Sequence, residues 1–243
     1  MKQRSLFLVI SGIILYLFGL LLGSALSAGL AWGEIETRLH TSFPPTAGLK
    51  TLKCPLLLAP AESGIITATF DNPTNELVTP EISLEINTTV GAKQTGQSLS
   101  LAPGAAQTLS WTVGAGDRIF GRLILVGVYQ SQYRQLGSRV AQCSILVLGL
   151  FGLSGIQTLT VIFAASILCL VLGSALWLLG MRQPGRPVSA ASNPGGVLAA
   201  TVLAAMLTSL PRWWGLTLFC LSLTVLMIGV ILTEYILFPS RHK

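Results

Sequence analysis

Hydrophobic residues are concentrated in four stretches that are almost free of charge, namely residues 6–31, 156–180, 197–210 and 216–238. Glu234 is the one carboxylate among them. Hydrocarbon does not solvate charge, and a helix needs about 20 apolar residues to cross a bilayer. The pattern therefore predicts a bundle of four transmembrane helices, of which the third is short because Pro211 follows it.

The segment between the first two stretches has a different pattern, in which apolar and polar residues alternate with a period of two. Ile and Leu alternate with Ser and Glu in 82–86, and residues 66–70 and 109–113 alternate in the same way. This period is typical of strands that bury one face. Six or seven such strands predict an antiparallel, immunoglobulin-like β-sandwich inserted between the helices, with the more continuously apolar segment 119–129 as a central strand.

These patterns divide the chain into consecutive segments. Pro44 and Pro45 block a long helix after the first stretch, so we expect a linker there. The expected segments are a first transmembrane helix or signal anchor at 1–31, the linker at 32–50, the sandwich at 51–148, a second transmembrane helix at 149–181, a cytoplasmic loop at 182–196, a third helix at 197–211, an outer turn at 212–215, a fourth helix at 216–238 and a cytoplasmic tail at 239–243.

Charge changes this picture by removing one partner and adding an orientation. The net charge is +6, but residues 32–148 carry eight acidic and eight basic residues, so the basic excess lies beside the apolar stretches and nucleic acid is not an expected partner. The positive-inside rule places that excess in the cytoplasm. Both termini are then cytoplasmic and residues 32–150 are extracytoplasmic, in a multi-pass protein of the plasma membrane, which we expect to be bacterial.

The first apolar stretch has two interpretations. Lys2 and Arg4, a long apolar run and the small residues at 24–28 are also the layout of a secretory signal peptide with its cleavage site. Apolar regions of signal peptides usually contain about 7–15 residues, and this one is longer. We favour an uncleaved membrane anchor, with a cleaved signal peptide as the alternative.

The four cysteines fall into two classes. Cys169 and Cys220 lie within apolar stretches, where a thiol behaves as a small hydrophobic group. Cys54 begins the β-rich region and Cys143 lies near its end. In an oxidising compartment these two predict a disulfide between the first and last strands, and two unpaired thiols are the alternative.

The β-rich region resembles bacterial immunoglobulin-like domains of the CARDB type over residues 54–147. The resemblance rests on four segments, which are TFDNPT at 69–74, VTPEISLEI at 78–86, LAPG at 101–104 and LSW at 109–111. It implies a sandwich fold and an adhesive or scaffolding role. It implies no catalytic residues, because functional sites are not properties of a fold.

The sequence does not favour catalysis or cofactor binding. His40 and His242 are the only histidines and lie far apart, and no nucleotide-binding, serine-hydrolase or metal-ligand spacing occurs. The outer acidic residues are expected to be solvated. Transport usually requires charged groups within the membrane, and Glu234 lies near the end of its stretch. We therefore predict no enzyme, no cofactor, no metal site and no small-molecule substrate.

Two sets of residues are candidates for interaction. Tyr133 and Arg134 lie in the polar loop 130–138, and Tyr129 precedes it; tyrosine and arginine are enriched in protein interfaces. A solvated hairpin is the alternative interpretation of this loop. The second set consists of small residues spaced by four, which favour close helix packing within the chain or with a partner: Gly19, Gly23 and Ser27 in the first stretch, and Ala200 and Ala204 in the third.

Three functional hypotheses follow. The first is a non-enzymatic membrane protein that presents its immunoglobulin-like domain to another protein or to a surface. The second is an accessory or structural subunit of a larger membrane complex, docked through the small residues. The third is a small transporter or channel subunit. The lipid bilayer is a partner in all three, and other membrane or extracytoplasmic proteins are partners in the first two.

Overall fold

The computed structural model describes residues 2–40, 47–49, 51–88, 91–181 and 192–237. The chain divides into two compact units. The helical unit comprises residues 1–31 and 160–243, and the β-rich unit comprises residues 32–159. The predicted cytoplasmic loop and tail lie largely outside the described residues.

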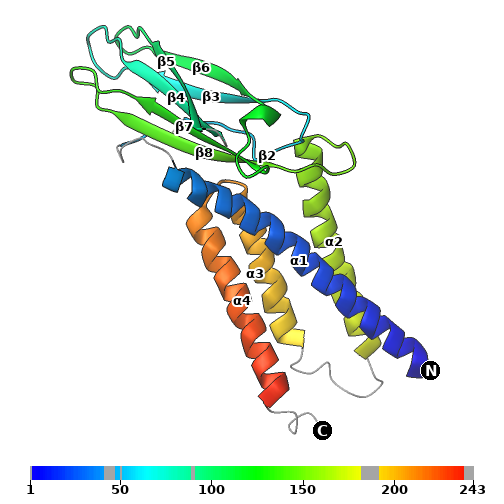
Figure 1. The fold of residues 1–243 in the computed structure, drawn as a ribbon. Coiled ribbons are helices and arrows are strands. Elements are labelled where there is room, and N and C mark those ends of the chain that lie inside the picture. Colours follow the sequence, from blue (N-terminus) through cyan, green and yellow to red (C-terminus); the bar gives the residue numbers. More distant parts are fainter. Residues whose placement is uncertain (1, 41–46, 50, 89–90, 182–191, 238–243) are drawn as a thin grey trace. The chain divides into compact units, whose positions relative to one another are not determined.

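The described residues form four helices (Figure 1), which are α1 (Lys2–His40), α2 (Gly155–Met181), α3 (Ser192–Ser209) and α4 (Trp214–Leu237). Within the described ranges, α1, α2 and α4 are long and apolar enough to cross a membrane, whereas α3 is shorter. The predicted linker at 32–50 is wrong for its first part, because α1 continues without interruption to His40. Residues 33–40 contain no proline, so nothing in the sequence ends the helix there.

The β-rich unit contains two sheets. The described strands are β1 (Ala47–Gly48), β2 (Leu57–Leu58), β3 (Gly64–Asp71), β4 (Glu81–Thr88), β5 (Gly91–Ser98), β6 (Ala106–Val113), β7 (Leu123–Gln130) and β8 (Arg139–Val147), with a short 3-10 helix, η1 (Ala115–Asp117), after β6. One sheet has the order β1-β8-β7-β4-β5, with β2 also paired to β8, and the other consists of β3 and β6.

The larger sheet is mixed, which corrects the prediction of a purely antiparallel sandwich. The long strands pair antiparallel, but the two-residue strands β1 and β2 both run parallel to β8. The core lies between the sheets and is formed by alternate residues of the strands, such as Ile66, Ile82, Val126 and Ile145. The period of two in the sequence therefore identified the buried face of these strands.

The predicted central strand at 119–129 begins later than expected. Strand β7 lies between β4 and β8, but it starts at Leu123. The preceding residues form a turn in which the backbone nitrogen of Arg122 donates to the carbonyl of Ile119 at 3.2 Å. Phe120 and Gly121 both have positive φ, of 53° and 68°. Positive φ is unfavourable for a residue with a phenylalanine side chain. The hydrophobicity of residues 119–122 therefore gave no sign that they form a turn and not the start of the strand.

In the helical unit, α3 and α4 form a hairpin whose helices are joined by threonine pairs. Thr208 Oγ1 lies 3.0 Å from Thr217 Oγ1 near the turn, and Thr224 Oγ1 lies 3.0 Å from Thr201 Oγ1 further along. The partners are seven residues apart on each helix, so the two pairs lie about two turns apart in one antiparallel register. Hydrogen bonds between hydroxyls hold apolar helices together where no hydrophobic driving force acts between them.

Candidate interaction site

Three connecting loops come together at one end of the sandwich. We call them the loop cluster, which comprises residues 72–80, 99–105 and 131–138. Val78 and Leu101 pair through hydrogen bonds in both directions, of 2.8 and 3.1 Å. Ser131 donates its backbone nitrogen to the carbonyl of Glu81 at 2.9 Å. The loops after β3 and β5 are therefore connected to each other, and the loop after β7 is attached to the start of β4.

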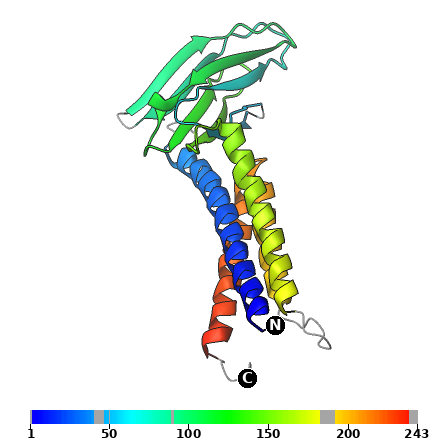
Figure 2. The same ribbon diagram turned by 90° about the vertical axis from the view of Figure 1, so that its right-hand side faces the viewer.

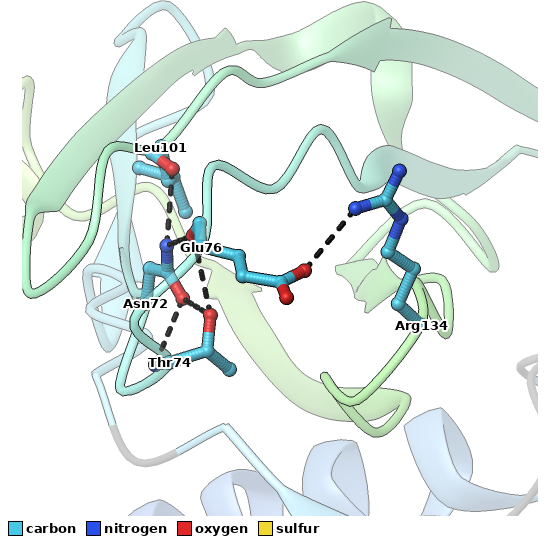
Figure 3. Close-up of polar contacts among 5 residues, drawn as sticks. All are labelled: Asn72, Thr74, Glu76, Leu101 and Arg134. Atoms are coloured by element: carbon cyan, nitrogen blue, oxygen red, sulfur yellow. Dashed lines mark hydrogen bonds and ion pairs between the residues drawn. The ribbon is translucent and has the colours of Figure 1, made fainter.

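Asn72 is the centre of this connection (Figure 3). Its Nδ2 donates to the carbonyls of Glu76 at 2.8 Å, Leu101 at 3.0 Å and Ala102 at 3.0 Å. Its Oδ1 accepts from the backbone nitrogen of Thr74 at 3.0 Å and from the hydroxyl of the same residue at 2.6 Å. The side chain is buried, so these bonds are protected from water. One amide thus fixes the first loop and attaches it to the second.

The third loop contains the predicted interaction residues. Tyr133 and Leu136 exchange backbone hydrogen bonds of 2.9 and 2.8 Å, and the Leu136 side chain is buried. Arg134, at the tip, has a φ of 50° and places its guanidinium carbon 5.7 Å from the centre of the Tyr133 ring. Its Nη1 lies 3.2 Å from Oε2 of Glu76 in the first loop (Figure 3). This exposed ion pair adds little stability, but it orients Arg134 toward the first loop.

Tyr129 lies apart from this arrangement, because it belongs to β7. It pairs with Ser83 on one side and Val140 on the other. An ion pair that the sequence did not predict flanks the cluster instead: Arg139 Nη1 lies 2.6 Å from Oδ1 of Asp71. The two residues start β8 and end β3, so their approach depends on how the sheets pack and leaves no local sequence signal.

Cys54 and Cys143 form a disulfide, with their Cα atoms 6.5 Å apart and a sequence separation of 89. Cys143 lies in β8 and contributes to the core. Cys54 lies outside the strands but follows Lys53, which pairs with Thr67 of β3. The bond therefore links the two sheets across the core, while Cys169 and Cys220 are free thiols in the helical unit.

In the helical unit, α1 runs beside α2 (Figure 2). Glycines of α1 lie at this contact: a Cβ atom added to Gly12 would lie 2.6 Å from the backbone nitrogen of Trp177, and one added to Gly19 would lie 2.9 Å from that of Leu170. A Cβ on Gly23 would approach Ser166 Oγ at 2.8 Å, and this hydroxyl donates to the carbonyl of Gly19 at 2.8 Å. The pairing is antiparallel and close, as small residues permit.

The other predicted packing residues differ in their surroundings. Ser27 is fully buried, whereas Ala200 is exposed and Ala204 is partly exposed. Thr208, four residues after Ala204, donates to the carbonyl of that residue at 2.8 Å. The helical unit therefore uses the glycines of α1 more than the alanines of α3. The side chain of Glu234 lies outside the described residues, so its surroundings do not test the transport hypothesis.

The expectation that the outer acidic residues are solvated is wrong for Glu36 and Glu85, which are both buried. Gln94 Nε2 lies 3.4 Å from Glu85 Oε2, and Glu36 Oε1 lies 3.4 Å from Nδ1 of His40. Both glutamates lie on the side of the larger sheet that faces away from the core. The end of α1 covers this side, and an uninterrupted helical sequence from Gly33 to His40 was the available signal.

Glu62 is a further functional carboxylate that the sequence analysis missed. Its Oε2 accepts from the backbone nitrogens of Ala59 at 2.9 Å and Gly155 at 2.6 Å, and these bonds hold the pKa of Glu62 below its ordinary value. Gly155 is the first residue of α2, where a negative charge interacts favourably with the helix dipole. Ser154 and Gln157 complete a capping box at the same end.

Among the described residues, no three histidine, cysteine, aspartate or glutamate side chains gather in a geometry that holds a metal ion. The features that the structure brings together are instead a loop cluster with a fixed arrangement, a disulfide between sheets and a helical unit with close packing. Of these, the loop cluster brings the exposed charged side chains of Glu76 and Arg134 together with the partly buried ring of Tyr133, and it is the candidate interaction site.

Comparison with known proteins gives little further information. No protein-family model matches the chain, and no curated protein matches it. The CARDB domain of the PF1109 protein from Pyrococcus furiosus is similar over 40% of this chain and 90% of that chain, with 12% identity and a TM-score of 0.32. A β-glucosidase from Erythrobacter marinus is similar over 40% of this chain and 15% of its own length, with 10% identity and a TM-score of 0.31.

A β-glucosidase from Listeria innocua is similar at the same level, with 14% identity, a TM-score of 0.30 and coverage of 42% of this chain and 16% of the enzyme. The chain thus spans about a sixth of the length of either glucosidase. These values permit no transfer of activity, substrate or site residues.

Proposed function

We propose that this chain is a non-enzymatic integral membrane protein that presents its β-rich unit to another protein through the loop cluster. The membrane part of the proposal is supported by the three long apolar helices in the described part of the chain. The interaction part is carried by one observation: the Asn72 side chain and backbone hydrogen bonds fix the loops of the cluster, and the ion pair directs Arg134 toward Glu76. Loops that are ordered before binding lose less conformational entropy when a partner docks.

The chemistry of the loop cluster favours a protein partner. Glu76 and Arg134 provide both signs of charge, Tyr133 provides an aromatic ring, and Leu77 of the first loop is an exposed apolar side chain. Interfaces combine a few aromatic and arginine anchors with a mixed polar rim. A surface without a charge excess gives no electrostatic advantage to a polyanion.

A photo-cross-linking experiment in cells tests this proposal. The photoreactive residue is placed at Leu77, within the loop cluster, or at Gln97 on the fully exposed strand β5 as a matched control. We expect a discrete protein adduct from position 77 and none from position 97. Tyr133→Ala and Arg134→Ala in the same chain should weaken the adduct. Adducts of equal yield at both positions, unchanged by these substitutions, would exclude the loop cluster as the binding surface.

The hypothesis of an accessory subunit receives less support in its original form. It uses the small residues of α1 and α3 to dock onto partner helices, but Gly19 and Gly23 lie against other helices of the same unit. Of the small residues that it names, Ala200 is exposed and would have to make the contact with a partner. We therefore retain the first hypothesis as the proposed function.

A further inference from the structure

The end of α1 buries two polar residues and exposes an apolar stripe beside the exposed Arg38 and His40, although a water-soluble domain usually buries its apolar stripe. Within the β-rich unit, Glu36 and Thr37 are buried, whereas Trp32 is 58% exposed and Leu39 is 72% exposed. Ile35 lies between these two on the sequence and is partly exposed. Positions 32, 35 and 39 are spaced by three and four, so they form one stripe on the helix surface.

The buried side of this segment is fixed by polar contacts with the sheet. Asn87 of β4 donates its Nδ2 to the carbonyl of His40 at 3.0 Å. Ser144 of β8 lies against Gly33, where an added Cβ would approach Ser144 Oγ at 2.6 Å, and its hydroxyl lies 3.3 Å from Oε1 of Glu34. These contacts determine which side of the helix faces outward, so the exposure of the apolar stripe is a property of the folded unit.

A second element extends the exposed stripe. Phe120, at the tip of the turn before β7, is 64% exposed, and its ring centre lies 6.5 Å from that of His40. The turn holds Phe120 at positive φ, which is unfavourable for an aromatic residue. Isolated exposed apolar residues need no explanation, but three large ones from two adjacent elements make a candidate docking surface.

We propose that this surface, formed by Trp32, Ile35, Leu39 and Phe120, lies in the headgroup layer of the bilayer. The argument for lipid is the continuity of the helix: the candidate span runs from Leu6 to His40, which is 35 residues. At 1.5 Å per residue this is about 52 Å, compared with about 40–45 Å for a bilayer with its headgroups. A tilt of roughly 35° places the whole span within that layer, inside the range observed for membrane helices.

The inference deepens the proposed function and rests on its membrane part, because it needs α1 to cross a bilayer. It assigns residues 32–40 the role of the interfacial end of the tilted span, whose apolar side contacts the headgroup layer as interfacial anchor residues do. The polar side then supports the β-rich unit directly. Contact with lipid along this surface would restrict the orientation in which the unit meets its partner.

Site-specific fluorescence in vesicles tests this inference. The full-length chain carries Cys169→Ala and Cys220→Ala, keeps the Cys54–Cys143 disulfide, and receives one new cysteine by Leu39→Cys or Phe120→Cys. The control is Leu77→Cys, which replaces an apolar residue that is 57% exposed in the loop cluster. Each thiol is labelled with an environment-sensitive nitrobenzoxadiazole probe, and the protein is reconstituted in phosphatidylcholine vesicles with or without lipids that bear a nitroxide near the headgroup.

We expect probes at 39 and 120 to emit at shorter wavelength and to be quenched by the nitroxide lipid about twofold or more, because an interfacial helix lies within the reach of this quencher. The probe at 77 should remain unquenched. Equal behaviour at all three positions in a protein that resists alkaline extraction would overturn this inference alone. Short-wavelength emission without quenching would identify a protein, not lipid, as the occupant. Release of the chain by alkaline extraction would contradict the proposed function as well.

Discussion

A Cβ atom at Gly19 of α1 would lie 2.9 Å from the backbone nitrogen of Leu170 in α2, so α1 and α2 meet with no space for even a methyl group. The next nearest atoms include the carbonyl oxygen of Ser166 at 3.0 Å, which is also backbone. Gly19→Ala must therefore move a helix and not merely a side chain. We expect it to lower the free energy of unfolding by about 1–3 kcal/mol, the usual cost of overpacking.

The control for this prediction is Gly229→Ala in α4, where no described atom lies within 4 Å of the added Cβ. Alanine has the higher helix propensity, so this variant should be neutral or slightly more stable. Thermal unfolding of both variants in the same detergent is the measurement. Equal midpoints for Gly19→Ala and Gly229→Ala would show that α1 and α2 do not pack through this glycine.

Asn72→Ala should weaken the loop cluster by removing the side chain that joins its first two loops. The substitution leaves the carbonyls of Leu101 and Ala102 without the amide donor, and it removes the acceptor for Thr74. Buried hydrogen bonds of this kind are each worth about 1 kcal/mol, so we expect a loss of about 2–4 kcal/mol in unfolding free energy. Chemical denaturation measures this loss.

The exposed neighbour Asn75→Ala is the matched control and should change stability by less than about 0.5 kcal/mol. Asn72→Asp separates the two halves of the network, because a carboxylate keeps the acceptor for Thr74 but loses the donor to the three carbonyls. We expect it to be as destabilising as the alanine variant. A stable aspartate variant would show that the donor side of the network contributes little.

The strands and apolar helices could be predicted from the sequence because their signals are local. The alternation around Ile82 and Leu84 reports which side of β4 is buried, and charge-free runs report α2 and α4. These local signals did not predict that the Asn72 side chain connects two loops, because this depends on residues about thirty positions away.

The way in which α1 packs against the sheet beyond residue 32 could not be recognised for a related reason. Its buried side is polar, so the segment lacks the inward apolar stripe that identifies an amphipathic helix. The helix is stabilised by polar contacts with Ser144 and Asn87, which lie in strands far along the chain. The same contacts explain why Glu36 is buried against expectation. Burial of a carboxylate is a property of tertiary structure that single-sequence patterns do not contain.

Removal of the disulfide should destabilise the β-rich unit. The bond joins residues 89 positions apart, and loss of a native disulfide typically costs about 2–5 kcal/mol. Cys54→Ala with Cys143→Ala should lower the unfolding midpoint, and a reductant should lower that of the wild type but not of the double variant. Cys169→Ala with Cys220→Ala serves as the control and should retain the response to the reductant. A wild-type protein that does not respond would show that the thiols are unlinked.

Gln130→Met should stabilise the protein. Gln130 is fully buried in β7, and neither its amide nitrogen nor its amide oxygen has a hydrogen-bond partner among the described residues. A buried polar group without partners costs about 1–3 kcal/mol, and methionine has a similar length without this cost. We expect a gain of about 1–2 kcal/mol in denaturant unfolding, compared with no measurable change for the exposed Gln97→Met. A loss of stability would indicate that internal water satisfies the amide.

Glu62→Gln should remove a pH-dependent contribution to stability. Two backbone nitrogens, those of Ala59 and Gly155, donate to the Glu62 carboxylate and lower its pKa in the folded state. The folded pKa therefore lies below that of the unfolded chain, about 4.3 for glutamate. The stabilisation is present above the unfolded value and disappears as the pH falls through the folded value.

Wild type should exceed Glu62→Gln in unfolding midpoint at pH 7, and the difference should vanish in acid. Glu81→Gln, at an exposed carboxylate of β4, is the control and should show no such dependence. A difference between wild type and Glu62→Gln that stayed constant from pH 7 to about pH 3 would mean that the amide loses packing or geometry and that the charge of Glu62 does not stabilise the start of α2.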